Sequence, residues 1–239
     1  MTDEMKKKLG IKTIAQSVED NGLKIILYGL SGAGKSTMIG TLPGTTLVLD
    51  TEKGLLVLEG QENIDVIEIS KISSPDPEEM TLLKVYQLIK DGTLSYDNYV
   101  LDSITDLSET LFAQIDADDS IDKGFGGLYT AFRKQMLQII KAFKALPTVN
   151  VVFIALADTI DINGMPKLFP STPHKKTSMS IMSIFDECIY LETTAIGTRV
   201  IRTTDSGNHA AKSRSGLEDG QEVTDLTVLY PQLNTNIKA

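Results

Sequence analysis

A glycine-rich segment near the start of the chain carries the residues with the clearest chemistry. Residues 29–36 match the pattern G-x-x-x-x-G-K-[S/T] without a gap. In such a loop, glycines let consecutive backbone N–H groups point at phosphate oxygens, while a lysine and a hydroxyl supply a cation and a metal ligand. The pattern predicts a nucleotide site; the alternative is a glycine-rich turn with a surface lysine. The expected nucleotide-binding residues are Gly29, Ser31, Gly32, Ala33, Gly34, Lys35, Ser36 and Thr37.

A carboxylate at the end of a later apolar run could complete a metal site. Asp102 ends the run 99–102, and we expect it to hold Mg²⁺ through water, opposite the Ser36 hydroxyl. The simpler alternative is that this strand end only caps the following helix, a role that Ser103 can also fill. The metal interpretation is favoured because phosphoryl transfer needs a second contact to the ion.

A third segment, which is acidic, offers a base for hydrolysis. The apolar run 47–49 ends in two carboxylates, Asp50 and Glu52. Hydrolysis needs a group that orients water in line with the γ-phosphate, and Glu52 stands just past the strand end, where a side chain can face the nucleotide. Asp50 is the alternative base, and a plain turn is the alternative role of the segment.

The segments around these residues alternate between short apolar runs and longer periodic stretches. Residues 23–28 read as a strand and residues 35–41 as a helix, which is the context in which the glycine-rich pattern binds phosphate. Strands that alternate with helices favour an α/β fold with a mostly parallel sheet. Further strands are expected at 46–50, 65–69, 99–102 and 149–157, further helices at 78–90, 103–117 and 128–146, and β-ribbon or sheet-edge strands at 187–191, 199–203 and 224–229.

Composition limits the other classes of site. The 239 residues include 23 Lys and Arg against 32 Asp and Glu, and the net charge of −9 argues against a surface coated in basic charge. One cysteine and two histidines leave no disulfide framework and no plausible zinc cluster. No apolar stretch reaches the length of a signal peptide or a membrane span, so we expect a soluble, cytoplasmic protein without membrane contact.

Three familiar classes of phosphate-loop protein do not match. The chain has no [N/T]-K-x-D motif, which a GTPase would use to read guanine. Arg133 is the only arginine before Arg199, so the arginine-rich lid of a small-molecule kinase is missing. A partition-type ATPase would carry an additional lysine where this chain has Leu30 and Ser31.

The order of these motifs resembles the RecA/recombinase superfamily, and most closely the phage-encoded RecA-like ATPases that act as single-strand annealing proteins. The resemblance covers residues 22–231 and is carried by segments 29–36, 47–55, 99–103 and 211–216. It implies a RecA-like P-loop NTPase core over residues 22–239, with a mostly parallel central sheet flanked by helices and with C-terminal β-strands. Residues 1–21 precede this core; they could form an oligomerisation arm or a frayed tail.

The resemblance also implies roles for individual residues. Glu52 matches the catalytic glutamate and Asp102 the Mg²⁺ aspartate, with ATP and Mg²⁺ as cofactors. Lys212 and Arg214 match the K-x-R pair that ring helicases insert into the nucleotide of the neighbouring subunit, which would make slow hydrolysis depend on assembly. The alternative for this pair is a solvated loop. One departure is that Asp158 stands near where RecA-type proteins carry a Gln or His sensor.

Two loops fall where the DNA-binding loops of the superfamily lie. These are residues 116–127 and 158–178, and they are expected to track single-stranded DNA once subunits assemble into a ring or filament. The expected function is annealing or recombination in a phage-infected cell. The alternative is a nucleotide-switched assembly protein or accessory ATPase with protein partners and no DNA role. The candidate DNA contacts are Lys123, Phe125, Lys167, Phe169, Lys175 and Lys176, with an exposed helix start near residue 177 as the alternative for the last two.

Overall fold

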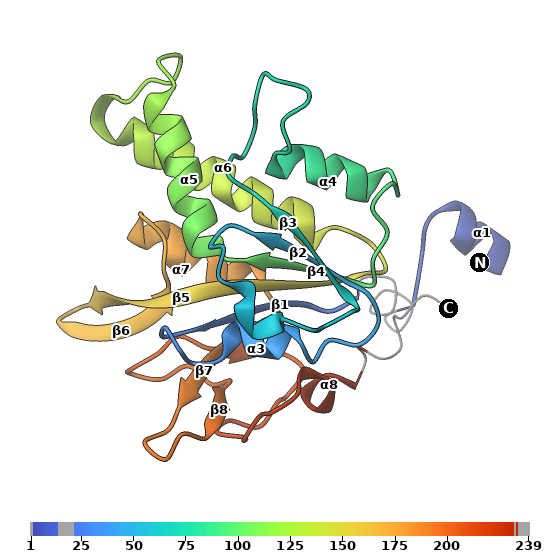
Figure 1. The fold of residues 1–239 in the computed structure, drawn as a ribbon, viewed down its shortest axis with the longest axis vertical. Coiled ribbons are helices and arrows are strands. Elements are labelled where there is room, and N and C mark those ends of the chain that lie inside the picture. Colours follow the sequence, from blue (N-terminus) through green and yellow to red (C-terminus); the bar gives the residue numbers. More distant parts are fainter. Residues whose placement is uncertain (1, 14–21, 232, 234–239) are drawn as a thin grey trace.

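A central sheet organises the chain in this computed structural model, which describes residues 2–13, 22–231 and 233. The strands run in the order β3-β2-β4-β5-β1-β7-β8 (Figure 1). Neighbours from β3 to β7 pair in parallel, whereas β8 and β9 pair antiparallel with β7, and β6 pairs antiparallel with β5. The strands are β1 (Lys24–Gly29), β2 (Thr46–Asp50), β3 (Ile64–Glu68), β4 (Asn98–Asp102), β5 (Asn150–Ile162), β6 (Met165–Pro170), β7 (Glu187–Thr193), β8 (Arg199–Arg202) and β9 (Lys212–Ser213).

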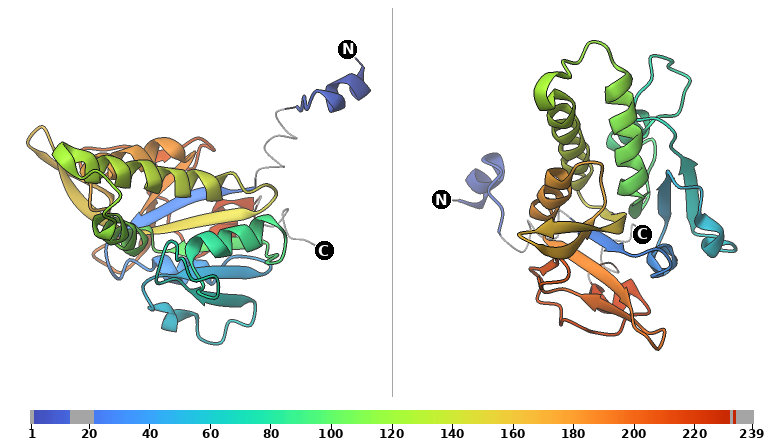
Figure 2. Two further views of the ribbon diagram at one scale, coloured as in Figure 1. Left: turned by 90° about the horizontal axis from the view of Figure 1, so that it is seen from above. Right: turned by 90° about the vertical axis from the view of Figure 1, so that its left-hand side faces the viewer.

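Helices cover both faces of this sheet, as Figures 1 and 2 show. The helices α4 to α7 pack on one face, while α3, the short helix η1 and α8 pack on the other. The predicted α/β fold of the RecA-like P-loop type, with a mostly parallel sheet and C-terminal strands, is confirmed. The helices are α1 (Asp3–Lys8), α3 (Lys35–Ile39), α4 (Leu82–Lys90), α5 (Ile104–Ala117), α6 (Gly127–Lys144), α7 (Lys175–Ile184) and α8 (Leu226–Leu229), with 3₁₀ turns η1 (Leu55–Leu58) and η2 (Gly124–Gly126).

Alternating side chains along the central strands build two cores. Tyr99 and Leu101 of β4 enter the core beneath α5 and α6, whereas Val100 between them enters the core beneath α3. Successive residues of a strand point to opposite faces, so a continuous apolar run fills both layers. This is why the central strands read as unbroken apolar segments.

The residue before a helix determines where several helices begin. The Ser103 hydroxyl accepts a hydrogen bond from the Asp106 N–H at 3.3 Å and begins α5 directly after β4. Thr81 does the same for α4 through the Lys84 N–H at 3.3 Å, so this helix begins later than the predicted residue 78. Such caps satisfy backbone donors that the first turn leaves open.

The second predicted loop is largely a hairpin, which corrects the expectation for residues 158–178. Strand β5 continues to Ile162 and returns as β6, with Ile160 opposite Lys167. Asn163 and Gly164 join the strands, both with positive φ (56° and 84°), as a two-residue hairpin turn requires. The backbone of β6 also pairs outward: the Leu168 N–H donates to Asn208 O at 2.8 Å, and the Ala210 N–H donates to Leu168 O at 2.9 Å.

Residues 224–229 were expected to be a strand and instead include the helix α8. Asp225 caps it by accepting the Thr227 N–H at 2.7 Å, and Leu226 and Leu229 bury the same face. Residues three apart share one face of a helix but point to opposite faces of a strand, so a helix lets both leucines enter the same core.

The structure describes part of the predicted N-terminal segment, residues 1–21, which precedes the predicted ATPase domain 22–239. Helix α1 follows Thr2, whose hydroxyl accepts the Met5 N–H at 3.3 Å. Residues 14–21, which make up the rest of the predicted N-terminal segment, lie outside the described residues. Among the described helices, none has both the length and the apolar character that crossing a bilayer requires.

Candidate active site

The glycine-rich loop connects β1 to α3 at the carboxyl edge of the parallel sheet. Gly32 and Gly34 have φ values of 77° and 91°, a region that favours glycine. Gly29 has a different reason: a Cβ there would lie 2.5 Å from the Leu191 carbonyl oxygen of β7. The conformation of the loop therefore requires each of these three glycines.

The side chain of Lys35 folds back beneath the loop. Its Nζ donates to the carbonyl oxygens of Gly29 at 3.1 Å and Leu30 at 2.9 Å, and the residue is buried. Burial lowers the pKa of Lys35, while the charges of Glu52 and Asp102 act in the opposite direction. The ammonium group thus lies between the loop and these carboxylates.

Ser36 and Asp102 meet directly at the start of α3. The Ser36 hydroxyl donates to Oδ2 of Asp102 at 3.0 Å, and Asp102 is 3% exposed. Burial, followed by the charge of Glu52, raises the pKa of Asp102 to about 6, against the effect of the Ser36 hydrogen bond. A hydroxyl oxygen beside a buried carboxylate oxygen forms a donor set that fits Mg²⁺, which prefers oxygen ligands.

Asp50 and Glu52, the two carboxylates at the end of β2, have different surroundings. Oδ1 of Asp50 accepts the backbone N–H groups of Glu52 at 3.0 Å and Lys53 at 2.8 Å, so this carboxylate shapes the turn. The side chain of Glu52 is open to solvent on one side. Partial burial raises the pKa of Glu52; the Asp106 carboxyl adds to this effect and the Ser103 hydroxyl opposes it. Of the two carboxylates, Glu52 is the one whose side chain stays exposed while it interacts with Lys35 and Asp102.

Register explains why these residues converge. Asp50 pairs with Asp102 across β2 and β4, and the Thr51 N–H donates to Asp102 O at 2.8 Å. Because the carboxyl ends of parallel strands share one edge, the loop after β1 and the ends of β2 and β4 face the same space. The structure thus brings Lys35, Ser36, Glu52 and Asp102 together.

Lys212 and Arg214 lie at the opposite edge of the sheet. Lys212 pairs with Cys188 near the start of β7, which is the amino end of the parallel strands. Its Nζ donates to the Met182 carbonyl oxygen at 2.8 Å, and Arg214 Nη1 lies 2.5 Å from Oδ1 of Asp186. These two residues are therefore not part of the phosphate site of their own chain.

The predicted DNA-contact residues divide into two groups. Lys123, Phe125, Lys175 and Lys176 lie around α6 and α7; Phe125 is fully exposed in η2, and the two neighbouring lysines are exposed at the start of α7. Lys123 is partly covered and donates to the Asp116 carbonyl oxygen.

The other two belong to the hairpin and are engaged there. Lys167 forms an ion pair with Asp205 at 2.6 Å and lies 5.9 Å from the centre of the Phe169 ring. Phe169 is only 7% exposed and packs with Ile160 and Ala210. The expectation that Phe169 presents a ring for base stacking is therefore not met, because its alternating position on β6 faces protein.

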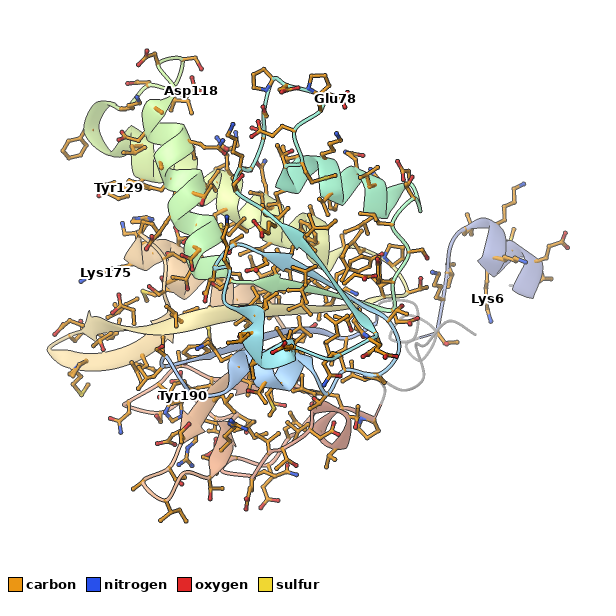
Figure 3. All side chains as sticks on the ribbon, in the orientation of Figure 1. Lys6, Glu78, Asp118, Tyr129, Lys175 and Tyr190 are labelled. Carbon is orange, nitrogen blue, oxygen red and sulfur yellow. The ribbon has the colours of Figure 1, made fainter. Side chains whose placement is uncertain are left out.

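The structure adds three residues to the first group, Tyr129, Arg133 and His174. Tyr129 is 44% exposed and its ring centre lies 5.1 Å from that of His174; Figure 3 shows Tyr129 and Lys175 on the same side of the molecule. Arg133, one turn along α6, donates to Ser180 of α7 at 3.0 Å. We call Phe125, Tyr129, Arg133, His174, Lys175 and Lys176 the α6–α7 surface. Residues 129 and 133 are four apart in a predicted helix, and this spacing, which puts them on one face, is the sequence signal that could have identified them.

Comparison with known proteins identifies the family. A family model described as an AAA domain matches residues 21–215. Among curated proteins, no sequence matches the chain. One similar solved structure is titled "Structural and biochemical analysis of a prototypical ATPase from the type III secretion system of pathogenic bacteria"; it has 18% identity and a TM-score of 0.47, and the match covers 72% of this chain and 52% of that one.

The two comparisons differ in what they support. The chain spans about half the length of the secretion-system ATPase, and at this identity and score the likeness carries no functional inference. The family model, by contrast, extends over most of the chain and includes the glycine-rich loop and the strand ends that carry the two acidic residues. The chain therefore belongs to the AAA-domain family, and it is a nucleotide-binding P-loop ATPase.

Proposed function

We propose that the protein is a Mg²⁺-dependent, RecA-like ATPase that assembles on single-stranded DNA and promotes annealing or recombination, in a phage-infected host cytoplasm. The observation that carries the ATPase part is the Ser36–Asp102 hydrogen bond of 3.0 Å at a strand end that Glu52 and Lys35 also face. This arrangement supports ATP as the substrate and Mg²⁺ as the cofactor.

The proposed reaction assigns one task to each side chain. Lys35 exchanges the loop carbonyls for the β- and γ-phosphate oxygens, and Thr37 donates to the α-phosphate. Ser36 and Asp102 hold Mg²⁺, which when bound offsets charge on the phosphates. Glu52 orients a water molecule whose oxygen attacks the γ-phosphorus. The bond to the bridging oxygen breaks, the water proton passes to Glu52, and ADP and phosphate leave.

Separate substitutions test binding and chemistry. Lys35→Ala is expected to abolish ATP turnover, whereas Glu52→Gln should keep ATP binding and lose turnover, because only the water-orienting oxygen is changed. Glu59→Gln, an exposed carboxylate after η1, is the matched control and should hydrolyse ATP normally. Phosphate release and ATP affinity measured on the same preparations decide this. Wild-type turnover in the Glu52 variant would remove it from the mechanism.

The α6–α7 surface supports the DNA part of the proposal. It combines exposed cations with aromatic rings, although the whole chain is acidic. Phe125, His174, Lys175 and Lys176 lie in the two segments that the RecA resemblance assigns to DNA, and the other two residues follow the first of these segments. Cations that meet phosphates and rings that stack on bases are the components of a single-strand binding groove. Within the proposal, Lys175, Lys176, Lys123 and Phe125 contact DNA, and Lys167 and Phe169 hold the hairpin in shape.

A salt titration tests this surface. Replacing Lys175 and Lys176 with alanine should weaken binding of a labelled single strand in the presence of an ATP analogue. Removing two phosphate contacts per bound subunit should reduce the slope of log affinity against log salt by about 1.4. Lys71→Ala/Lys90→Ala, which removes two lysines near α4, is the control. An unchanged slope in the α7 variant would exclude these lysines as DNA contacts.

Self-association forms part of the same proposal. We propose residues 22–239 as one ATPase domain and residues 1–21 as an arm that docks on a neighbouring subunit; the exposed apolar side chains of Met5, Leu9 and Ile11 support this. Lys212 and Arg214 would then reach the nucleotide of a neighbour and make slow hydrolysis depend on assembly. Specific activity should rise with protein concentration, and Arg214→Ala should remove that rise. Normal activity of this variant would refute the trans role.

A second candidate is a nucleotide-switched assembly protein with protein partners and no DNA role. It is favoured by η1, which follows the Glu52 turn and leaves Leu56 82% exposed and Val57 52% exposed. Exposed neighbouring apolar side chains suit a protein contact better than a nucleic acid. ATP turnover that single-stranded DNA neither stimulates nor inhibits, measured alongside the salt titration, would support this candidate.

A further inference from the structure

Besides Lys35, a second cation lies against the glycine-rich loop, and it comes from a distant part of the chain. Arg199 is the first residue of β8, and its side chain lies against Gly34. A Cβ at Gly34 would stand 2.2 Å from Nε and 2.6 Å from Cζ of Arg199. The guanidinium group is therefore in direct contact with the loop residue that precedes Lys35.

Strand pairing holds both partners of the contact between Arg199 and Gly34 in place. Strand β7 pairs with β1, and its Leu191 carbonyl oxygen borders Gly29 at the start of the loop. Strand β8 turns back along β7 with Arg199 opposite Thr193, and the Arg199 carbonyl oxygen accepts the Val223 N–H at 3.0 Å. Arg199 thus stands at the carboxyl edge of the sheet, where the phosphate site also lies.

The environment of Arg199 differs from that of the other three arginines. Arg202 pairs with Glu192 at 2.6 Å and with Asp219 at 3.6 Å, Arg214 pairs with Asp186, and Arg133 donates to Ser180. The half-buried Arg199 side chain makes no hydrogen bond or ion pair with any residue in the ranges 2–13, 22–231 or 233. A guanidinium group has five N–H donors and keeps its charge, so partial burial without an acceptor is unfavourable.

We propose that Arg199 binds the phosphate chain of the nucleotide within its own subunit, an inference that rests on the proposed ATPase function. Phosphate oxygens supply the acceptors that the guanidinium lacks, and its planar donor pairs match phosphate geometry better than a lysine does. Glycine at position 34 leaves the space through which the arginine reaches the loop. Arg199 therefore provides a cation in cis, independent of the proposed trans role of Arg214.

Competition binding without DNA tests the assignment. The affinities of ATP and of inorganic tripolyphosphate are measured for the wild type, Arg199→Ala, Arg199→Lys and Lys35→Ala, with Arg202→Ala as the control for loss of another arginine of β8. Loss of a charge-assisted contact should weaken both ligands about 10- to 100-fold in Arg199→Ala. Arg199→Lys should fall between this variant and the wild type, and Arg202→Ala should match the wild type.

The outcomes separate this inference from the function on which it rests. If Lys35→Ala binds ATP normally, the proposed nucleotide site is wrong, whatever Arg199 does. If Lys35→Ala loses ATP while Arg199→Ala stays within about threefold of wild type, only the Arg199 assignment fails. Weaker ATP binding with unchanged tripolyphosphate binding would place the arginine on the base and also overturn the proposal.

A measurement on the unaltered protein covers the case in which a variant does not fold. Phenylglyoxal modifies accessible arginines, and mass spectrometry reports the extent of modification at each site. Bound ATP should protect Arg199 and leave Arg133 unprotected. Equal modification of Arg199 with and without saturating ATP would refute the contact.

Discussion

Replacing Asp102 with asparagine should stabilise the nucleotide-free protein while it removes Mg²⁺-dependent turnover. Asp102 is 3% exposed, and its side chain accepts a hydrogen bond from the Ser36 hydroxyl at 3.0 Å. An asparagine side-chain oxygen can accept the same bond, so the substitution removes the buried charge and little else. The buried carboxylate costs stability because burial outweighs the favourable charge of Lys35, and that cost is the quantity to be measured.

The size of the effect follows from the pKa of Asp102. Burial and the charge of Glu52 raise that pKa from 3.8 to about 6. A shift of roughly two units corresponds to about 3 kcal/mol, an order-of-magnitude figure. Because the folded-state pKa lies above the unfolded value, the folded protein holds this proton more tightly. The associated stability is complete below the unfolded pKa and is lost as the pH rises through about 6.

Urea denaturation without Mg²⁺ measures this difference. At pH 7.5 Asp102→Asn should raise the free energy of unfolding by about 3 kcal/mol, and at pH 5 the gain should be about half as large. Ser36→Ala is the control, because it removes the other proposed metal ligand but no charge. Equal stability of the asparagine variant and the wild type at pH 7.5, or an equal gain in Ser36→Ala, would refute the reasoning.

Three further predictions concern the packing of the chain. Gly34→Ala should lose about 1–2 kcal/mol of stability and weaken ATP binding, because φ is 91° and the new Cβ would meet a side chain 2.2 Å away. Gly54→Ala, with open space around it, should change neither quantity in the same denaturation and binding assays. The Cys188 thiol, whose pKa burial raises to about 12, should react with a thiol reagent at pH 8 only as fast as the protein unfolds. Reaction at the rate of free cysteine would contradict this burial. Phe132→Ala should cost about 3–5 kcal/mol in urea denaturation because the ring is fully buried. Phe125→Ala, at a fully exposed position, should cost less than about 0.5 kcal/mol, and a similar loss in both would contradict the packing described.

The elements around the phosphate loop could be predicted because local chemistry specifies them. The pattern of glycines, lysine and serine at residues 29–36 requires a strand before it and a helix after it, and β1 and α3 are found there. The strand at 46–50 was predicted with its observed bounds, since the apolar run and the carboxylate mark its ends. In these segments, local pattern and tertiary packing point to the same answer.

The hairpin of β5 and β6 could not be read in the same way. Its strands carry Asp158, Asp161 and Lys167, and the hydrophobic pattern that predicts strands is weak where both faces meet solvent or loops. The Asn163–Gly164 pair was the one local signal of a tight turn. The polar composition and the prolines of residues 158–178 indicate a loop more strongly than this pair indicates a hairpin.

Two features of the site also depend on the three-dimensional arrangement and not on the local sequence pattern. Which of Asp50 and Glu52 faces the nucleotide depends on the turn that Asp50 itself caps, and this is visible only in three dimensions. The contact of Arg199 with the loop depends on the register of β8 on β7 and of β7 on β1. Neither register leaves a trace in the spacing of residues along the chain.

The backbone pairing of β6 with residues 208–210 joins two regions that the sequence keeps far apart. The hairpin cannot shift relative to that segment without breaking the two hydrogen bonds of Leu168, and Lys167 adds its ion pair with Asp205. Two residues after Ala210 the chain enters β9, which carries Lys212 and leads to Arg214. A displacement of the hairpin that keeps these hydrogen bonds must therefore also move residues 208–210, which stand directly before the K-x-R segment.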